Sequence, residues 1–362
     1  MRILHCIPSM LNGGTERQLG YLVAGQVRRG SDVSVVLLQG GPNLDRLSAS
    51  GARICCLFRR TKYDPRLLTE MIRLIRRGTP DIVHTWLPLM DVVGGLASRL
   101  TGVPWVLSER SSSQAYPFTL WNGLRAAFGA SAQAVVSNSK GGDAYWESRL
   151  RRPRRRYVIP NVLPLDEIAQ APPVSLDTIG LETGRKMLLH VGRLSPEKNL
   201  GSLILALRHA VTRAAFTAYL CGDGPHQGWT EELIQAQGLS GQVRLTGYRG
   251  DVRGWMKRAD AFISVSTFEG SANAVLEAVA CGCPLVLSDI PAHRAIVGEH
   301  GAFFVNPGSP ESIAEGIVRV LSESAEAKRR AEIARTSIRH VSVAEAARQY
   351  EEVYQSVMIH RR

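Results

Sequence analysis

Short apolar runs alternate with longer amphipathic stretches along the first half of the chain. Such runs, bounded by turn residues, predict β-strands, and the stretches between them have the periodicity of helices. The predicted strands are at 3–7, 33–38, 53–57, 81–85, 105–107, 134–137 and 157–159, and the predicted helices are at 15–29 and 65–77. This alternation is typical of a parallel sheet with helices on its faces.

The alternation stops near residue 163 and restarts near residue 186. The stretch between contains Pro164, Pro172 and Pro173 and no convincing strand, so we expect 166–184 to be an interdomain linker. Strands are predicted again at 186–191, 216–221, 243–245, 261–265 and 285–287, with helices from near Leu200 and Ala272. We therefore expect two α/β domains, at 1–165 and 185–340, in this chain of 362 residues.

Residues 341–362 form a separate C-terminal segment with a predicted helix at 343–359. One face of that helix is apolar. Its members are Val343, Ala346, Ala347, Tyr350, Val353, Tyr354 and Val357. The pattern allows the helix to pack on either domain, including back on the N-terminal one.

The composition is that of a packed globular protein, with 44% hydrophobic and 21% charged residues. The net charge of +12 is unusual and calls for an anionic partner. Nucleic acid, an anionic membrane face and phosphorylated ligands would each satisfy it, and charge alone does not choose among them.

Neither a signal peptide nor an apolar run of the roughly 20 residues needed to span a bilayer is present, so we expect a cytoplasmic protein. The six cysteines lie mostly in apolar stretches, and Cys281 and Cys283 lack both metal-site spacing and nearby histidines. We interpret them as reduced structural thiols.

Ligands of doubly wound domains bind at the carboxyl ends of the strands, so the residues after each strand carry the candidate chemistry. Arg193 and Lys198 follow the first strand of the second domain and precede a helix. Backbone N–H groups and the helix dipole favour an anion at such a place, and the two cations could neutralise a diphosphate. The alternative is a solvated basic loop.

Two glutamates follow a later strand of the same domain. Glu269 lies in the loop, and Glu277 lies one helical turn beyond Asn273. The small residues Gly270, Ser271 and Ala272 between them would let a ligand approach the backbone. One carboxylate could face the reacting end of an extended ligand and the other its far end.

Gly13 and Gly14 follow the first strand of the chain and precede a helix, which suits close approach to a phosphate or a sugar. The loop is not the G-x-G-x-x-G fingerprint, and no acidic residue closes the second strand where one would bind a ribose. These features count against an NAD-dependent dehydrogenase.

At these loops the sequence resembles the retaining GT-B glycosyltransferases of family 4, which include sucrose synthase and many bacterial hexosyl- and N-acetylhexosaminyltransferases. The resemblance covers nearly the whole chain. It rests on Gly13-Gly14-Thr15-Glu16-Arg17, Asp81-Ile82-Val83-His84, Ser137-Asn138-Ser139, Ile159-Pro160-Asn161, Val191-Gly192-Arg193 with Lys198, Cys221-Gly222-Asp223-Gly224-Pro225, Gly247-Tyr248, and the pair Glu269 and Glu277.

The resemblance implies two Rossmann-like domains that face each other across a deep cleft, with the donor site on the second domain. Arg193 and Lys198 would bind the diphosphate of a nucleotide sugar and stabilise the leaving group, Glu269 would hold the donor sugar, and Glu277 would bind the ribose. Further donor contacts are implied for Gly13, Gly14, Gly222, Asp223, Gly224, Tyr248, Arg249, Gly270, Ser271, Ala272, Asn273 and Ala274.

The expected reaction needs no metal and no other cofactor. No Asp-x-Asp pair occurs in the sequence, and the two cations can take the place of a divalent ion. In retaining members of this fold a front-side departure and attack is favoured. We see no compelling nucleophile here, so we interpret Glu269 as a positioning and electrostatic residue.

The first domain departs from the family pattern at two positions. Arg110 stands where many relatives have a histidine that touches the donor sugar, and Trp86 stands where a second histidine often follows His84. Arg110 could contact the donor sugar or phosphate or a charged acceptor group, or form an ion pair with Glu109 or a neighbour. Trp86 could stack on a sugar or only pack in the core. His84 is as well explained by a structural role. With Thr15, Arg17 and Asn138, these residues are our acceptor-side candidates.

Basic residues gather in the first domain, which is the acceptor domain in this fold. Residues 149–156 hold six arginines, and Arg59, Arg60, Lys62, Arg73, Arg76 and Arg77 add to them. Attraction to anionic lipid can reach about 1 kcal/mol per basic residue. We expect a lipid-linked or glycan acceptor and peripheral association with the inner membrane face; the alternative is a solvated surface.

Other functions fit less well. A nucleic-acid-binding protein would explain the charge but not the paired glutamates, and no nucleic-acid-binding module is recognisable. A GT-B phosphorylase would need a pyridoxal lysine motif, and an epimerase further carboxylates and histidines. A transferase for a small soluble acceptor and a catalytically silent nucleotide-sugar binder both stay open. The base, favoured as UDP and next as GDP, is not legible in the residues.

Overall fold

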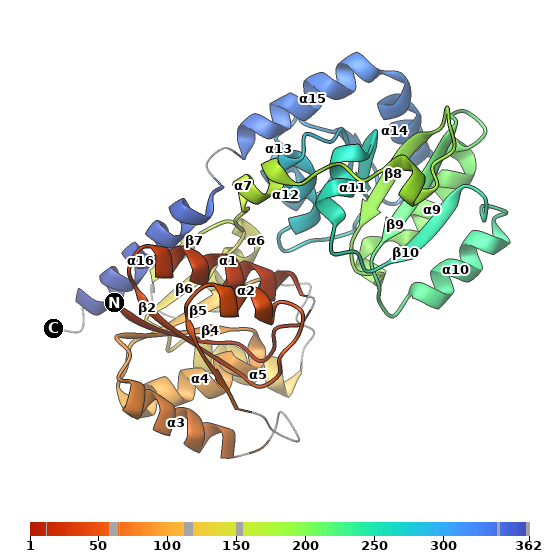
Figure 1. Ribbon diagram of the computed structural model, residues 1–362. Helices are drawn as coiled ribbons and strands as arrows, with labels where there is room; N and C mark the ends of the chain where they lie inside the picture. The colour runs from red at the N-terminus through yellow and green to blue at the C-terminus, as the bar shows by residue number, and fades with distance from the viewer. Residues whose placement is uncertain are drawn as a thin grey trace. The chain divides into compact units, whose positions relative to one another are not determined.

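The computed structural model describes residues 1–11, 13–57, 64, 66–111, 119–149, 155–338 and 341–359. The chain divides into two compact units. The first contains Met1–Leu163 and Val341–Arg362, and the second contains Pro164–His340. Figure 1 shows a sheet with helices on its faces in each unit.

The first unit is built on a seven-stranded parallel sheet with the order β3-β2-β1-β4-β5-β6-β7. Its elements are β1 (Arg2–Cys6), α1 (Gly14–Arg28), β2 (Asp32–Leu37), α2 (Leu44–Ala49), β3 (Arg53–Cys56), α3 (Arg66–Gly78), β4 (Ile82–Trp86), α4 (Pro88–Thr101), β5 (Trp105–Glu109), α5 (Leu120–Gly129), β6 (Ala134–Ser137), α6 (Lys140–Glu147), β7 (Arg155–Val158) and α16 (Val343–Ile359). The central strands β4 and β5 are buried along their whole length, as expected for parallel strands with both faces covered.

The second unit repeats the architecture with six parallel strands in the order β10-β9-β8-β11-β12-β13. Its elements are α7 (Leu165–Gln170), α8 (Leu176–Ile179), β8 (Lys186–Val191), the 3₁₀ turn η2 (Pro196–Lys198), α9 (Leu200–Ala210), β9 (Phe216–Cys221), α10 (Gln227–Ala236), β10 (Val243–Gly247), α11 (Val252–Arg258), β11 (Ala261–Ser264), α12 (Asn273–Ala280), β12 (Leu285–Ser288), α13 (Pro291–Val297), β13 (Phe303–Val305), α14 (Pro310–Ser322) and α15 (Ser324–Ser337).

Both sheets change direction at their centre. The chain builds outward from β1 through β2 to β3 and then returns to start β4 on the other side of β1. The second unit does the same around β8, with β11 on its other side. Ligands of open α/β sheets bind outside the carboxyl ends of the strands at such a switch point. The fold therefore provides one candidate position in each unit.

The C-terminal helix α16 packs on the first unit, beside α1 (Figure 1). All seven residues of its predicted apolar face are buried. They join the core cluster that includes Leu19 and Leu22 of α1 and Ile3 of β1. The return of the chain to its first unit thus follows from one apolar helical face.

The segment 166–184, expected as a linker, belongs to the second unit and contains the short helices α7 and α8. Its isoleucines, Ile168 and Ile179, are buried. Backbone contacts fix the rest, because Val174 N–H donates to the Gly254 carbonyl and the Lys257 ammonium binds the carbonyls of two α7-end residues. These hydrogen bonds use backbone groups of the segment and not apolar side chains. The segment therefore shows no hydrophobic periodicity in its sequence.

All six cysteines are free thiols in the structure. Cys6, Cys221 and Cys283 are buried, and burial raises the pKa of the Cys6 thiol to about 12. A thiol that stays protonated and covered behaves as a small apolar side chain.

Candidate active site

The switch point of the second unit brings the predicted donor residues together. Strand β8 pairs with β11, so the loops that follow these two strands lie at the same edge of the sheet. Lys198 ends the turn η2 after β8, and Glu269 follows β11. Thr267 N–H donates to the Glu197 carbonyl over 2.9 Å, which ties one loop to the other.

The Lys198 ammonium and the Glu269 carboxylate form an ion pair with 2.6 Å between Nζ and Oε1. Their side chains are only 17% and 11% exposed. The Ser266 hydroxyl donates a second hydrogen bond to the same carboxylate oxygen over 2.8 Å. Burial acts to raise the pKa of Glu269, but Lys198 and Ser266 outweigh it and hold that pKa below its usual value. The carboxylate is therefore ionised and fixed in place.

Asn199 positions Lys198. Its backbone adopts φ 57°, a left-handed conformation that asparagine tolerates better than most residues. Its side-chain amide donates to the carbonyls of Val265 over 3.2 Å and Pro307 over 2.7 Å. These bonds anchor the start of α9 to the end of β11 and so fix the lysine against the glutamate.

Arg193 lies on the same loop, and its exposed guanidinium has no hydrogen-bond or ion-pair partner within the described part of the chain. Lys198 and Glu269 are thus assembled already, whereas Arg193 is available to a ligand. A guanidinium in this state can bind a phosphate with two parallel hydrogen bonds.

The Gly222 to Gly224 loop supports the Arg193 loop from one side. Gly222 and Gly224 have φ of 148° and 154°, and a Cβ on either would lie 1.9 Å or 2.4 Å from a carbonyl oxygen of the Arg193 loop. The Leu194 N–H donates to the Asp223 carbonyl over 2.8 Å. These glycines therefore serve the close packing of two loops, and the Asp223 side chain is exposed beside them.

Helix α12 begins at Asn273, with Ala272 at its N-cap and no side chain capping it. Gly270, Ser271 and Ala274 surround this helix start and are at least partly covered. Glu277 is 3% exposed one turn further along. On the loop after β10, Tyr248 is 53% exposed. Arg249 beside it pairs with Asp251 over 3.2 Å and lies over the Trp255 ring.

In the first unit, Gly13 is the N-cap of α1 and Gly14 its first residue. A Cβ on Gly13 would lie 1.9 Å from Glu16 Oε2, so the missing side chain accommodates the carboxyl group of Glu16. That carboxyl group is nearly buried, and burial raises its pKa. Thr15 and Arg17 are partly exposed on the same turn.

His84 and Trp86 belong to a buried chain of hydrogen bonds at the switch point of the first unit, and both are at most 1% exposed. Trp86 Nε1–H donates to His5 Nδ1 over 3.0 Å, and the other nitrogen of His5 lies 2.8 Å from Gln26 Oε1. The Gln26 amide donates to the Tyr354 hydroxyl over 3.3 Å, which lies 2.7 Å from His84 Nδ1. His84 therefore has a structural partner at Nδ1, whereas its Nε2 is buried without a partner among the described residues. Trp86 forms its bond to His5 and also lines a pocket.

The expected alternative for Arg110, an ion pair with Glu109, is not formed. Glu109 Oε2 pairs with Arg125 Nη1 over 2.9 Å and accepts a hydrogen bond from Trp146, and its other oxygen binds the Ser111 N–H. Arg110 instead donates to the Asn161 side chain. The buried Asn138 amide donates to the Arg110 carbonyl over 3.3 Å, so Asn138 supports the loop that carries the arginine.

Two family models match the chain in succession. Residues 12–167 match Glycosyltransferase Family 4, and residues 176–337 match Glycosyl transferases group 1. The chain belongs to glycosyltransferase family 4. The prediction of a GT-B fold with two Rossmann-like domains is confirmed.

Named relatives of this glycosyltransferase come from several bacteria. It is 25% identical to the UDP-Gal:alpha-D-GlcNAc-diphosphoundecaprenol alpha-1,3-galactosyltransferase of Escherichia coli, over 81% of this chain and 80% of that one. It is 27% identical to the lipopolysaccharide core biosynthesis glycosyltransferase LpsE of Rhizobium meliloti, over 89% of each. The fold matches Anabaena Alr3699/HepE, solved with UDP and glucose, with a TM-score of 0.86, 21% identity and coverage of 98% and 100%.

Sequence reasoning missed two buried histidines beside the Lys198–Glu269 pair of this glycosyltransferase. His190 Nδ1 lies 3.1 Å from the Ile263 carbonyl, and His293 Nδ1 lies 3.0 Å from the Ser288 carbonyl. A carbonyl only accepts, so each Nδ1 carries the proton. Each Nε2 is then an acceptor, and both are buried without a hydrogen-bond partner among the described residues.

Burial lowers the pKa of His190 to about 4 and also lowers that of His293, so both rings are neutral near pH 7. Both sense the charges of Lys198 and Glu269. The sequence offered one signal for each. His190 lies one residue before the end of β8, and His293 lies in the first turn of α13, after β12. Neither histidine belongs to a motif that would have distinguished it from a core residue.

The basic surface of the glycosyltransferase is only partly visible. Arg59, Arg60, Lys62 and the centre of 149–156 lie outside the described residues. Within the described part, Arg156 pairs with Asp143 and Glu147, and Arg155 binds a carbonyl of α16. Helix α3 exposes arginines along one side, namely Arg66, Arg73, Arg76 and Arg77.

The described residues lack two further features. No group of three or more His, Cys, Asp or Glu side chains is arranged there to hold a metal ion. Among the same residues, every helix is too short or too polar to cross a bilayer.

Proposed function

We propose that this glycosyltransferase moves a hexose or N-acetylhexosamine from a nucleotide diphosphate sugar to a glycan or lipid-linked acceptor, with retention of configuration and without a metal. The assembled Lys198–Glu269 pair at the switch point of the second unit carries this proposal. A fixed carboxylate next to a partly buried cation can hold sugar hydroxyls at one end and a diphosphate at the other. Cell-surface polysaccharide or glycoconjugate synthesis is the process that such a transfer serves.

The diphosphate would bind to Arg193 and Lys198. Arg193 offers its free guanidinium, and the Lys198 ammonium has further N–H donors beyond the one that faces Glu269. Preorganised cations stabilise the charge that develops as the nucleoside diphosphate departs. They also take the role that a divalent ion has in other transferases, which is the basis for proposing metal independence.

The sugar would bind between Glu269 and the two histidines. Sugar hydroxyls are donors as well as acceptors, and the Nε2 atoms of His190 and His293 are buried acceptors that need a donor. Glu277 on α12 is proposed to bind the ribose, and Tyr248 to lie near the base. These roles use the residues around the switch point without requiring a covalent intermediate.

The transfer breaks the bond between the anomeric carbon and the diphosphate oxygen, and the electron pair leaves with the diphosphate. The acceptor hydroxyl oxygen then bonds to the anomeric carbon on the same face. Its proton passes to the departing phosphate oxygen, so no enzymatic base has to accept it. Glu269 stabilises the positive charge on the sugar ring during this exchange.

UDP is the proposed base and GDP the second choice. The E. coli relative uses UDP-Gal according to its name, and its acceptor carries diphosphoundecaprenol. The lipid-linked acceptor proposed here follows that relative and the R. meliloti enzyme of lipopolysaccharide core synthesis.

A panel of UDP, GDP and ADP, read by thermal shift, tests the donor assignment. We expect UDP to raise the midpoint most. The preferred nucleotide sugar is then supplied with EDTA and an acceptor extract, and release of free nucleoside diphosphate is measured. Loss of turnover in EDTA that magnesium or manganese restores would contradict metal independence. Binding without any turnover would indicate a silent nucleotide-sugar binder, and turnover with soluble acceptors alone would contradict the lipid-linked acceptor.

Association with an anionic membrane surface is a separate part of the proposal. The exposed arginines of α3 provide positive charge for anionic head groups, at about 1 kcal/mol or less each. Flotation with liposomes that contain or lack anionic lipid tests this, with Arg73, Arg76 and Arg77 replaced by Gln as the variant. Equal flotation on both liposomes would contradict it.

A further inference from the structure

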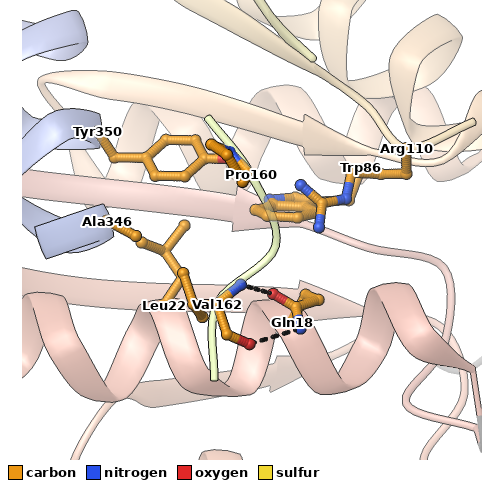
Figure 2. A pocket seen from close by; sticks show the side chains of 8 residues that line it. All are labelled: Gln18, Leu22, Trp86, Arg110, Pro160, Val162, Ala346 and Tyr350. Carbon is orange, nitrogen blue, oxygen red and sulfur yellow. Dashed lines mark hydrogen bonds between the residues drawn. The ribbon is translucent and has the colours of Figure 1, made fainter. Parts of the chain in front are cut away.

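A small pocket opens at the carboxyl edge of the sheet in the first unit. Trp86 ends β4, Arg110 follows β5, and Pro160 and Val162 follow β7. Helices α1 and α16 complete the wall with Gln18, Leu22, Ala346 and Tyr350. Figure 2 shows the Arg110 guanidinium beside the Trp86 ring, and the two hydrogen bonds between Gln18 and the Val162 backbone that fix the opposite side.

Arg110 supplies the charge of this pocket, and its contacts are neutral. The guanidinium lies 5.1 Å from the centre of the Trp86 ring and donates to the Asn161 side-chain oxygen. The Tyr350 hydroxyl in the same pocket is buried without a hydrogen-bond partner among the described residues. Within the described residues no carboxylate lies within ion-pair distance of it. Glu109 attracts it from further away, but both of its oxygens are bound elsewhere.

One buried N–H donor of the guanidinium has no acceptor among the described residues. Arg110 Nε is buried and has no hydrogen-bond partner in the described part of the chain. A covered cation without a counter-ion is unfavourable, and burial accordingly lowers the pKa of Arg110, although arginine stays charged at neutral pH. The contrast with Arg125 is direct, because that buried arginine lies between Asp91 and Glu109.

We propose that the pocket around Arg110 binds an oxyanion of the acceptor substrate, a phosphate or a carboxylate. The planar fork of arginine matches the oxygens of both groups, and the Tyr350 hydroxyl provides a further donor. The apolar walls from Trp86, Leu22 and Val162 lower the local dielectric constant and so strengthen the attraction. The inference rests on the proposed function, since it defines the acceptor as an anionic molecule.

The probes are inorganic phosphate and glucuronate, with glucose as the neutral control. They are titrated by thermal shift into full-length protein in which Arg193→Gln and Lys198→Ala remove phosphate binding at the donor residues. In this background we expect an anion to bind and glucose not to bind. Phosphate alone points to a phosphorylated acceptor, and glucuronate alone points to an acidic sugar.

Arg110→Gln should weaken anion binding at least about tenfold, the usual effect of losing hydrogen bonds to a charged group. Arg110→Lys keeps the charge but not the fork, so we expect an intermediate loss. Arg149→Gln is the matched control, because Arg149 also lies over an aromatic ring, 3.8 Å from the centre of Tyr145, but not in the pocket. It should change anion affinity less than about twofold.

The proposal is overturned if neither anion binds more tightly than glucose, or if Arg110→Gln retains the affinity of its parent. Thermal unfolding of each unliganded variant shows that it is folded, and Arg110→Lys gives a second measurement should the glutamine variant not fold. UDP binding by the protein with Arg193 and Lys198 intact is measured separately. Its absence would contradict the proposed function, whereas its presence without anion binding would contradict only the Arg110 pocket.

Discussion

The same position of the fold is built differently in the two units. His5 on β1 and His190 on β8 each lie one residue before the end of the strand at the switch point. In the first unit His5 has hydrogen-bond partners on both nitrogens and lies under Trp86 and α16. In the second, His190 Nε2 has no hydrogen-bond partner among the described residues, and the charges of Lys198 and Glu269 act on the pKa of the ring. The comparison separates a histidine whose partners all come from the chain itself from one whose acceptor has no partner among the described residues.

Replacing the carboxylate of the second unit should have the largest effect. Glu269→Gln keeps the shape and the Ser266 bond but removes the charge next to Lys198. We expect turnover to fall about 10²- to 10³-fold, the scale of losing one preorganised electrostatic group. The measurement is the initial rate of nucleoside diphosphate release, with exposed Glu311→Gln as control. Turnover near that of the wild type would refute the role of Glu269.

Acid should destabilise both units through their buried histidines. Burial lowers the pKa of His5 and of His190 to about 4, while the unfolded chain titrates near 6.5. A folded pKa below the unfolded one means that the stability is present above pH 6.5 and is lost as pH falls toward 4. The loss is about 3 kcal/mol for each of the two.

Urea unfolding at a series of pH values measures this loss. His190→Gln should flatten the dependence, and His209→Gln, which changes an exposed histidine of the same unit, should leave it unchanged. Asp91 opposes the effect in the first unit, because burial raises its pKa to about 6. Equal pH dependence in His190→Gln and wild type would contradict the assignment of a neutral buried ring.

Removing the Tyr354 hydroxyl should destabilise the first unit, because this group joins His84 to Gln26 in the buried chain of hydrogen bonds. Tyr354→Phe deletes the group that lies 2.7 Å from His84 Nδ1 and accepts from Gln26. We expect a loss of about 1–3 kcal/mol in the free energy of unfolding, with UDP affinity unchanged. Tyr157→Phe, which loses a half-buried bond to Ser356 of the same helix, should cost less. A fall in UDP affinity without a fall in stability would contradict the structural role of this hydrogen-bond chain.

The smallest effect is expected at His293. His293→Asn can keep the bond to Ser288 but lacks the Nε2 acceptor. We expect turnover to fall about threefold to tenfold, the scale of one hydrogen bond, with stability nearly unchanged. Kinetics at saturating donor separate a change in turnover from one in KM. A large loss of stability with normal turnover would show that this ring belongs to the core.

Strand ends were the most informative part of the sequence. The first sheet, five of the six strands of the second and the proximity of Lys198 to Glu269 could be predicted, because parallel strands place their carboxyl ends at one edge and apolar runs mark the strands. The short strand β13 (Phe303–Val305) was missed. The direct ion pair could not be predicted, since it depends on the left-handed Asn199 and its bonds to Val265 and Pro307. The catalytic and binding roles assigned to these residues stay predictions.

Long-range partners explain most of what the sequence did not show. Whether His84 faced solvent or the core depended on Tyr354, 270 positions away. The charge of Arg110 could have been neutralised by its neighbour Glu109, but Arg125 occupies that carboxylate. The segment 166–184 carries little apolar pattern, because backbone carbonyls and N–H groups hold much of it.

The return of α16 to the first unit makes the second unit an insertion. The chain leaves the first unit after Leu163 and re-enters it at Val341, and Leu163 pairs with Ser342 in a parallel bridge. Because bridged residues are about 5 Å apart, the two ends of the insertion are neighbours in space. Because the bridge is parallel, a tight turn cannot join the two ends, but a designed crossover segment from Leu163 to Val341 would close the first unit as a continuous chain. Residues 164–340 could then be exchanged for another unit without altering the fold of the first.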